Sequence, residues 1–221
     1  TSPSYQWQVN TGSAWSDVPS NGTSLSYDAS ESGDYRVIIT DQGVPSTSCP
    51  ISVTVNALPT VSLSVLPSTI VCQGTTSTIS ALATGNSPFI YKWRTGGIEM
   101  STETSTSFST NTSGVFDVKV VDANGCEAIS SQSTITVNSL PAQVAASVTQ
   151  PTCLLSTGTI TVSTPHESGM TYSIDGVNFT NTTGVFTGVS TDNYTVYAKN
   201  ANGCVGPTAS VTVNAQPVTP A

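Results

Sequence analysis

Cysteine is the residue type whose number and spacing in this sequence could support covalent chemistry. The five cysteines are Cys49, Cys72, Cys126, Cys153 and Cys204. Zinc sites typically use pairs of cysteines only a few residues apart, and no two of these cysteines have such a spacing. Disulfide bonding in an oxidising, extracellular compartment is therefore the chemistry that they favour.

Acid–base and nucleophilic catalysis have little support in the sequence. The only histidine, His166, lies in a polar loop, residues 165–169, and we predict that it is solvated there. A catalytic base must be held beside its target, and no nucleophile elbow, phosphate-binding loop or nucleotide fingerprint is present. The sequence predicts that the protein is not an enzyme, has no catalytic residues and uses no cofactor.

Calcium is the ion that scattered acids in an extracellular protein could bind. The local candidates are Asp122 with Asn124, and Asp175 with Asn178. Calcium takes six to eight oxygen ligands, and these residues supply two side chains at a time. We therefore predict that they form turns and that there is no metal site.

Three tryptophans are candidates for stacking on sugars. Trp7 and Trp93 occupy the third-strand position at which sandwich folds bury a core tryptophan. Trp15 lies outside that pattern and is the candidate for an exposed aromatic platform. A further aromatic set matches the corner tyrosine of sandwich folds, where packing is expected: Tyr35, Phe116 and Tyr194.

Two segments recur three times along the chain and define internal repeats. The first ends each repeat, at residues 52–59, 134–141 and 210–217, and the second lies upstream, at 34–41, 115–122 and 193–200. Each run alternates apolar and polar residues, the period of a half-buried strand, and the same pattern predicts strands at 133–138 and 185–189 among others. Asn124-Gly125 and Asn202-Gly203 favour the positive φ angles of a tight hairpin turn between them.

Regularly spaced short strands with Gly, Asn and Pro turns predict an all-β fold of tandem immunoglobulin-like β-sandwich repeats. We divide the chain into an N-terminally truncated repeat at residues 1–58, complete repeats at 59–141 and 142–217, and a linker at 218–221. The first repeat is expected to lack its opening strands because its Tyr-x-Trp strand begins at Tyr5. No segment has a helical period.

The cysteines occupy equivalent places in the second and third repeats. Cys72 and Cys153 come early in their repeats, while Cys126 and Cys204 follow the Asn-Gly turns. Equivalent places predict one disulfide within each repeat, Cys72–Cys126 and Cys153–Cys204. On the loop-entropy model each would stabilise its sandwich by about 4 kcal/mol. Buried free thiols are the alternative.

Cys49 takes the late-cysteine place of the first repeat in this alignment. Its early partner would precede residue 1, so Cys49 is expected to be unpaired here. An unpaired thiol that bonds to another molecule is the alternative.

Composition restricts the partners. The net charge is −8, with five Lys and Arg against thirteen acids. Five cations can neutralise only a small number of phosphate groups. We therefore do not expect the protein to bind nucleic acid or anionic membrane surfaces. No apolar run is long enough to insert into a membrane, and no signal peptide opens the sequence.

At these motifs the chain resembles a known group of surface proteins. The third repeat is similar to repeats of gliding-motility adhesins of the SprB type, through its residues 151–153, 158–162, 172–176 and 194–204. The first two repeats resemble the associated immunoglobulin-like or PKD-like repeats, although residues 42–48 depart from the Ala-Asn-Gly turn. The resemblance implies a very long protein exported by the type 9 secretion system of Bacteroidetes.

Three functional hypotheses follow. The first is a stalk or adhesive segment of a cell-surface adhesin, whose partners are the other repeats of the same chain and, where it adheres, a surface polysaccharide or solid surface. The second is a structural subunit of an extracellular filament or sheath. The third is a carbohydrate-binding module of a secreted enzyme.

Overall fold

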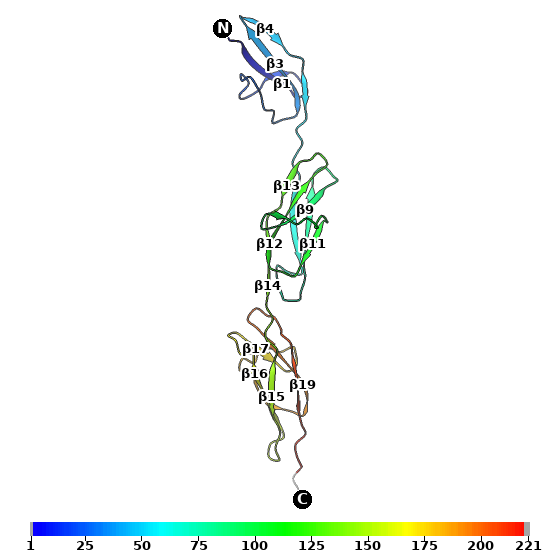
Figure 1. The fold of residues 1–221 in the computed structure, drawn as a ribbon, viewed down its shortest axis with the longest axis vertical. Coiled ribbons are helices and arrows are strands. Elements are labelled where there is room, and N and C mark those ends of the chain that lie inside the picture. The colour runs from blue at the N-terminus through cyan, green and yellow to red at the C-terminus, as the bar shows by residue number, and fades with distance from the viewer. Residues whose placement is uncertain (1, 219–221) are drawn as a thin grey trace. The chain divides into compact units, whose positions relative to one another are not determined.

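The computed structural model describes residues 2–218 and contains only strands and connecting loops (Figure 1). The predicted linker at 218–221 therefore lies outside the described residues, apart from Val218. The chain divides into two compact units. The first comprises Thr1–Ser62, Leu82–Lys92 and Val118–Ser130, and the second comprises Leu63–Ala81, Trp93–Asp117 and Ser131–Ala221.

Residues 4–53 form one antiparallel sheet in the order β2-β1-β3-β4, with β5 also paired to β3. Its strands are β1 (Ser4–Asn10), β2 (Trp15–Asp17), β3 (Gly33–Asp41), β4 (Val44–Thr47) and β5 (Ile51–Val53). Residues 2–58 contain no second sheet. The alternating apolar residues of β1 and β3 therefore have no facing strands, and most of them are only half-buried.

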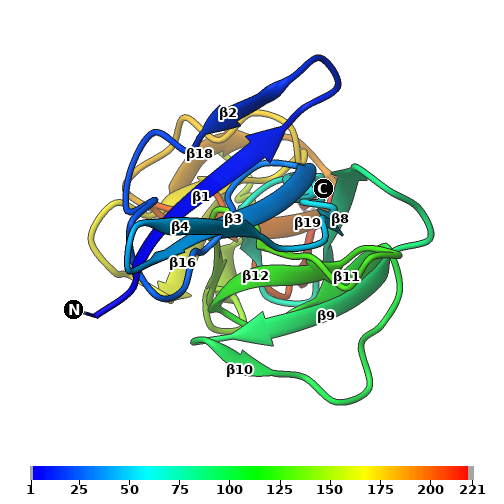
Figure 2. The ribbon, with the colours of Figure 1, turned by 90° about the horizontal axis from the view of Figure 1, so that it is seen from above.

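Residues 60–138 form two sheets, one in the order β11-β8-β6 and one in the order β10-β9-β12-β14-β7, to which β13 adds beside β12. The neighbours β12, β9 and β10 are visible in Figure 2. The strands are β6 (Thr60–Leu66), β7 (Ile70–Cys72), β8 (Ser77–Thr84), β9 (Ile90–Thr95), β10 (Ile98–Glu99), β11 (Ser107–Thr110), β12 (Gly114–Val121), β13 (Glu127–Ile129) and β14 (Ser133–Asn138).

Residues 145–213 form two three-stranded sheets, β15-β16-β18 and β17-β19-β20. The strands are β15 (Ala145–Thr149), β16 (Gly158–Thr164), β17 (Thr171–Ser173), β18 (Val185–Val189), β19 (Asp192–Lys199) and β20 (Ala209–Val213). The all-β prediction of tandem immunoglobulin-like sandwiches is confirmed.

In residues 60–138 and 145–213, period-2 alternation places one apolar face of each sheet in a core. Trp93 of β9 is fully buried, and its ring packs 5.8 Å from that of Phe108, which lies 5.3 Å from Phe116. The core of residues 145–213 is built around Tyr172 and Ile160, both essentially inaccessible. These aromatic and β-branched residues fit the pleated inner faces of packed sheets.

Strand positions agree closely with the alternation in the sequence. The predicted strands at 133–138 and 185–189 have those bounds in the structure. Three strands of three residues were not predicted, β2, β7 and β13. β7 pairs in parallel with β14, and a parallel partner so distant in sequence leaves no local turn signal.

The Asn-Gly hairpin turns differ from the expected geometry in one respect. Only the glycines have positive φ, 81° at both Gly125 and Gly203, and Asn124 and Asn202 do not. The N–H of Gly125 donates to the carbonyl oxygen of Asp122, closing a four-residue turn that precedes the left-handed glycine. This is the hairpin loop with a glycine bulge, which needs one positive φ and not two.

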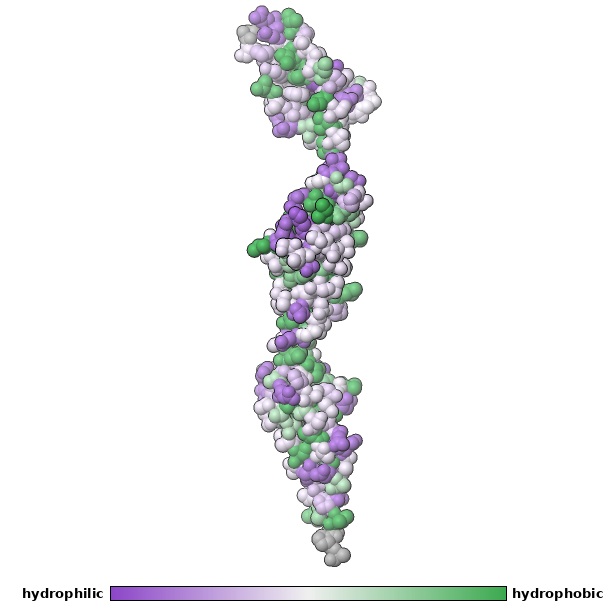
Figure 3. All heavy atoms as spheres, turned by 45° about the vertical axis from the view of Figure 1, so that its right-hand side comes forward, coloured by the Kyte–Doolittle hydropathy of each residue, from purple (hydrophilic) through white to green (hydrophobic). Residues whose placement is uncertain are grey.

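Hydrophobic side chains on the face shown in Figure 3 are scattered among weakly polar ones. Exposed apolar residues such as Leu82, Ile98 and Val177 occur singly. Among the described residues, no helix is long and apolar enough to cross a membrane.

Candidate functional site

A disulfide joins Cys72 to Cys204, with 5.6 Å between the two Cα atoms. Cys72 is the last residue of β7 and lies opposite Asn138, the last residue of β14. Cys204 is fully buried and follows the glycine turn after β19, where its N–H donates to Oδ1 of Asn200. The bond spans 132 residues and connects the sheet containing β7 to the hairpin after β19.

The predicted pairings within each repeat do not occur, because Cys126 and Cys153 are free thiols. In the third repeat, β19 separates the two predicted partners. Cys204 follows the end of β19, whereas Cys153 lies near its start, where its carbonyl oxygen accepts from Gln216 beyond the partner strand β20. An eight-residue strand is roughly 25 Å long, but disulfides need Cα atoms within about 7 Å.

The same reason excludes the predicted Cys72–Cys126 bond. Cys72 lies opposite the end of β14, and β14 pairs with the beginning of β12. Cys126 lies beyond the end of β12, next to β13. The full length of β12 again separates the two thiols.

Residues 139–144, the segment between β14 and β15, are held from the side of Cys204. Nδ2 of Asn200 donates to the carbonyl oxygen of Ser139 at 2.9 Å. The N–H of Val144 donates to the carbonyl oxygen of Pro207. A Cβ atom at Gly206 would lie 2.7 Å from the carbonyl oxygen of Pro141, so only glycine permits this approach. Hydrogen bonds, close packing and a disulfide therefore act on one short segment.

The loops that hold Cys126 and Cys204 have the same construction. In each, the backbone N–H of the cysteine donates to Oδ1 of the residue four positions earlier, Asp122 or Asn200. The reciprocal bond from the N–H of that residue to the cysteine carbonyl is also present in both. Cys126 is half-buried and free, while Cys204 is buried and bonded.

Cys49 does not take the late-cysteine place that the sequence alignment gave it. The hydroxyl of Ser48 accepts from the N–H of Val37, and the hydroxyl of Ser130 accepts in the same way from Val118. This register makes Cys49 the counterpart of the residue after Ser130, five positions beyond Cys126. Cys49 is exposed and unpaired, as expected, but for a different reason.

One buried polar atom at these loops has no partner. Asp122 is 5% exposed, and its Oδ2 makes no hydrogen bond. Its counterpart Asn200 places an NH2 group at that position and donates to Ser139. In the repeat alignment Ala57 corresponds to Ser139, so we expect an amide at position 122 to donate to the carbonyl oxygen of Ala57.

We expect Asp122→Asn to stabilise the protein by about 1 kcal/mol, because a buried, unpaired carboxylate oxygen is replaced by a donor. Urea unfolding followed by circular dichroism measures the change. The matched control is Asn200→Asp, which turns a donor into an acceptor facing Ser139 and should destabilise by about 1–3 kcal/mol. A decrease in stability for Asp122→Asn would contradict the expectation.

Asp175 organises a turn. Its Oδ1 accepts from the hydroxyl of Ser173 and from the N–H groups of Val177 and Asn178. Its Oδ2 accepts from Nδ2 of Asn178. The hydrogen bond from Ser173, followed by those from Asn178 and Val177, lowers the pKa of Asp175 far below its ordinary value.

Because this folded-state pKa is depressed, the contribution of Asp175 to stability should be complete above its unfolded pKa of about 3.9 and lost as the pH falls towards the folded value. A carboxyl-detected NMR titration should therefore show Asp175 still ionised below pH ~3.9. Asp175→Asn keeps an Oδ1 acceptor and removes this part of the acid dependence. A titration midpoint near the ordinary value would contradict the assignment.

His166, the candidate for acid–base chemistry, makes hydrogen bonds to strand β16 and to Tyr172. Nε2 of His166 donates to the carbonyl oxygen of Val162, and Nδ1 lies 3.1 Å from the hydroxyl of Tyr172. That hydroxyl donates to the carbonyl oxygen of Pro165, and burial raises the pKa of Tyr172. His166 is thus part of a hydrogen-bonded turn.

The three tryptophans differ in how deeply they are buried. Trp93 is a core residue as predicted, and its indole N–H donates to the carbonyl oxygen of Ser105. Trp7 is only half-buried and stacks on Tyr27, because no facing sheet covers it in residues 2–58. Trp15 has the guanidinium of Arg36 over its ring at 4.1 Å, so one face of this candidate platform is occupied.

Two corner tyrosines have the expected hydrogen bond to a carbonyl four residues upstream. The hydroxyl of Tyr35 donates to Glu31, and that of Tyr194 donates to Ser190. Burial is the main cause that raises the pKa of Tyr35.

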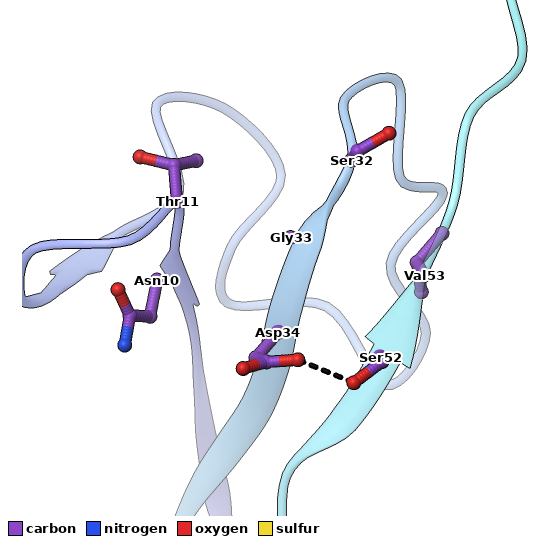
Figure 4. A pocket seen from close by; sticks show the side chains of 7 residues that line it. All are labelled: Asn10, Thr11, Ser32, Gly33, Asp34, Ser52 and Val53. Carbon is purple, nitrogen blue, oxygen red and sulfur yellow. Dashed lines mark hydrogen bonds between the residues drawn. The ribbon is translucent and has the colours of Figure 1, made fainter.

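A polar hollow of about 300 Å³ lies where β1 ends and β3 begins (Figure 4). The hydroxyl of Ser52 donates to the Asp34 carboxylate across it, and the remaining lining includes Asn10 and Thr11. Asp34 and Ser52 are cross-strand partners on β3 and β5, so their hydrogen bond also joins the two strands. Among residues 2–218 no three His, Cys, Asp or Glu side chains are grouped to hold a metal ion.

No family model matches the sequence, and no curated protein matches it. The structure of the N-terminal four Ig domains of Dscam1 isoform 4.44 aligns at a TM-score of 0.32 and 16% identity, over 62% of this chain and 38% of that one. The N-terminal eight Ig domains of DSCAM isoform 1.30.30 align at 0.30 and 14%, over 96% and 36%.

The fibronectin(III)-like modules of Clostridium thermocellum CbhA align at a TM-score of 0.42 and 14% identity, over 70% of this chain and 94% of that one. This chain spans about 38% of the length of the Dscam1 structure. At these levels of similarity no function transfers to it.

Proposed function

We propose that this chain is a non-enzymatic segment of a long cell-surface adhesin, composed of the repeats 1–58, 59–141 and 142–217, and that it acts as a stalk. The observation that carries the proposal is the Cys72–Cys204 disulfide. It joins strand β7 of one sandwich to the β19–β20 hairpin of the next and thereby restrains the segment between them. A covalent restraint between successive modules serves a chain that transmits force.

The same bond supports an extracellular location. Disulfides persist outside the cytosol, and the charge of −8 with five cations leaves few cleavage sites for trypsin-like proteases. The resemblance to SprB-type repeats supports type 9 export and a role in gliding motility. The described side chains support no catalytic mechanism, since His166 and Asp175 are engaged in turns.

The test is the size and location of the native parent protein. An antibody raised against this chain should label intact cells and detect one species of several hundred kilodaltons on a denaturing gel, with the same mass after reduction. Labelling only after cell lysis, or a small parent chain, would overturn the proposal.

The filament-subunit hypothesis is supported by one observation, the exposure of the free thiols of Cys49 and Cys153. A subunit linked through these thiols would give a ladder of bands that collapses on reduction, and the gel above separates the two functions.

The carbohydrate-module hypothesis depends on Trp15. We expect Trp15→Ala to leave retention on insoluble polysaccharides unchanged, because Arg36 covers one face of the ring. Affinity electrophoresis in polysaccharide gels measures this, with Trp7→Ala as the comparison from the same sheet. Binding by the unaltered chain that is lost only in Trp15→Ala would favour the module instead.

A further inference from the structure

We propose that Cys126 and Cys153 each form a disulfide with a cysteine of the neighbouring repeat, so that the Cys72–Cys204 bond is one member of a series that links every repeat to the next. This inference deepens the proposed function and rests on it, because it requires further repeats in the parent chain. In the series, the early cysteine of one repeat bonds to the late cysteine of the repeat that follows it.

The first support is that early cysteines lie where their sandwich ends. Cys72 is beside the last residue of β14, with the N–H of Gln73 donating to the carbonyl oxygen of Asn138. Cys153 is beside the segment after β20, with Nε2 of Gln216 donating to its carbonyl oxygen. Asn138 and Asn214 are equivalent in the repeats, so both thiols lie where the chain leaves a sandwich.

The surroundings of Cys153 leave room for a partner. The side chain is exposed, and a hollow of about 330 Å³ is lined by Cys153, Gln216, Pro217 and Val218. Val218 is 89% exposed. At Cys72 the equivalent space is where the hairpin loop of Cys204 makes its bond.

The second support is the identity of the two late-cysteine loops. Gly125 and Gly203 have the same φ. The carbonyl oxygen of Cys126 accepts from the N–H of Asp122 at 2.9 Å, and that of Cys204 accepts from the N–H of Asn200 at 3.0 Å. The loop of Cys126 therefore presents its thiol as the loop of Cys204 does. Cys126 differs in being half-buried and in lacking a bonded partner among the described residues, whereas Cys204 is fully buried and bonded.

Disulfide formation is an oxidation, and it needs an electron acceptor. Two thiols lose two protons and two electrons as the S–S bond forms, and a small-molecule or protein disulfide accepts them and becomes two thiols by exchange. Cys49 is outside the series, since it lies five positions beyond the late place, and it should stay a thiol.

Two lengthened chains test the proposal. In the first, a second copy of residues 142–217 follows Pro217, so that the added junction has the same Pro–Ala sequence as the Pro141–Ala142 junction. In the second, a copy of residues 60–141 is inserted after Pro141. Both are refolded in a glutathione redox buffer, free thiols are alkylated, and the disulfides are mapped by peptide mass spectrometry.

In the first chain we expect Cys153 to bond to the copied Cys204, while the original Cys72–Cys204 bond persists and Cys49 is alkylated. Cys153→Ser in that chain should free the copied Cys204 for alkylation and change nothing else. In the second chain the original Cys72 should bond to the copied Cys126. The copied Cys72 then takes Cys204.

A bond between Cys153 and Cys204 of the same repeat, a Cys153–Cys153 dimer, or an alkylated Cys153 in the folded chain would each overturn the proposal. If the first chain fails to form its Cys72–Cys204 bond, the second chain tests the proposal. There, an original Cys72 that does not bond to the copied Cys126 would overturn it. Because both chains supply the neighbouring repeat, failure here leaves the surface-labelling test of the proposed function unaffected.

Discussion

Stretched from its two ends, the fully unfolded chain should be shorter by about 470 Å with the disulfide intact than after reduction. The bond spans 132 residues, and an extended residue adds at most roughly 3.6 Å. Force passes from Cys72 directly to Cys204, so residues 73–203 carry none of it. Single-molecule stretching with and without reductant measures the difference.

The matched control is the double variant Cys72→Ser with Cys204→Ser, which should reach the reduced length under both conditions. Bonds within each repeat would give another result, because the two loops of 54 and 51 residues would release their length in two separate steps. A two-step release would contradict the linkage between repeats. A single step supports it.

In a stalk, some segments of the chain would therefore carry force and others would not. Under load the disulfide protects most of two sandwiches, from Gln73 to Gly203, and exposes β6, β7 and β20 to force. These strands are held by backbone ladders at the edges of their sheets, β6 beside β8 and β20 beside β19. Partial extension without loss of either core is the expected mechanical response.

Replacing Trp93 by alanine should lower the free energy of unfolding by about 3–5 kcal/mol. The side chain is fully buried against Phe108, and its removal leaves a cavity and an unpaired carbonyl at Ser105. Urea unfolding followed by far-ultraviolet circular dichroism measures the loss. The sandwich of residues 145–213 should unfold at an unchanged urea concentration.

Ile90→Ala on the same strand is the control, because Ile90 is 58% exposed. Its cost should be within about 0.5 kcal/mol, as for other surface substitutions. A Trp93→Ala change of less than 1 kcal/mol would mean that the tryptophan does not organise this core.

The sequence by itself determined the strands and their repetition. Alternation of apolar and polar residues is a local property, and the strands that it predicts at 133–138 and 185–189 have those bounds in the structure. The glycines of the two hairpins could be placed for the same reason, because a left-handed φ selects glycine locally. The classes of early and late cysteine also came from the repeats alone.

Tertiary structure alone decided which cysteines pair. Sequence spacing does not say that β12 and β19 each run the length of a sandwich between an early and a late thiol, so the neighbour within a repeat is far away. Register placed Cys49 outside the series, and the absence of a facing sheet in residues 2–58 left Trp7 half-buried. Such contacts join residues distant in the chain, and no local pattern encodes them.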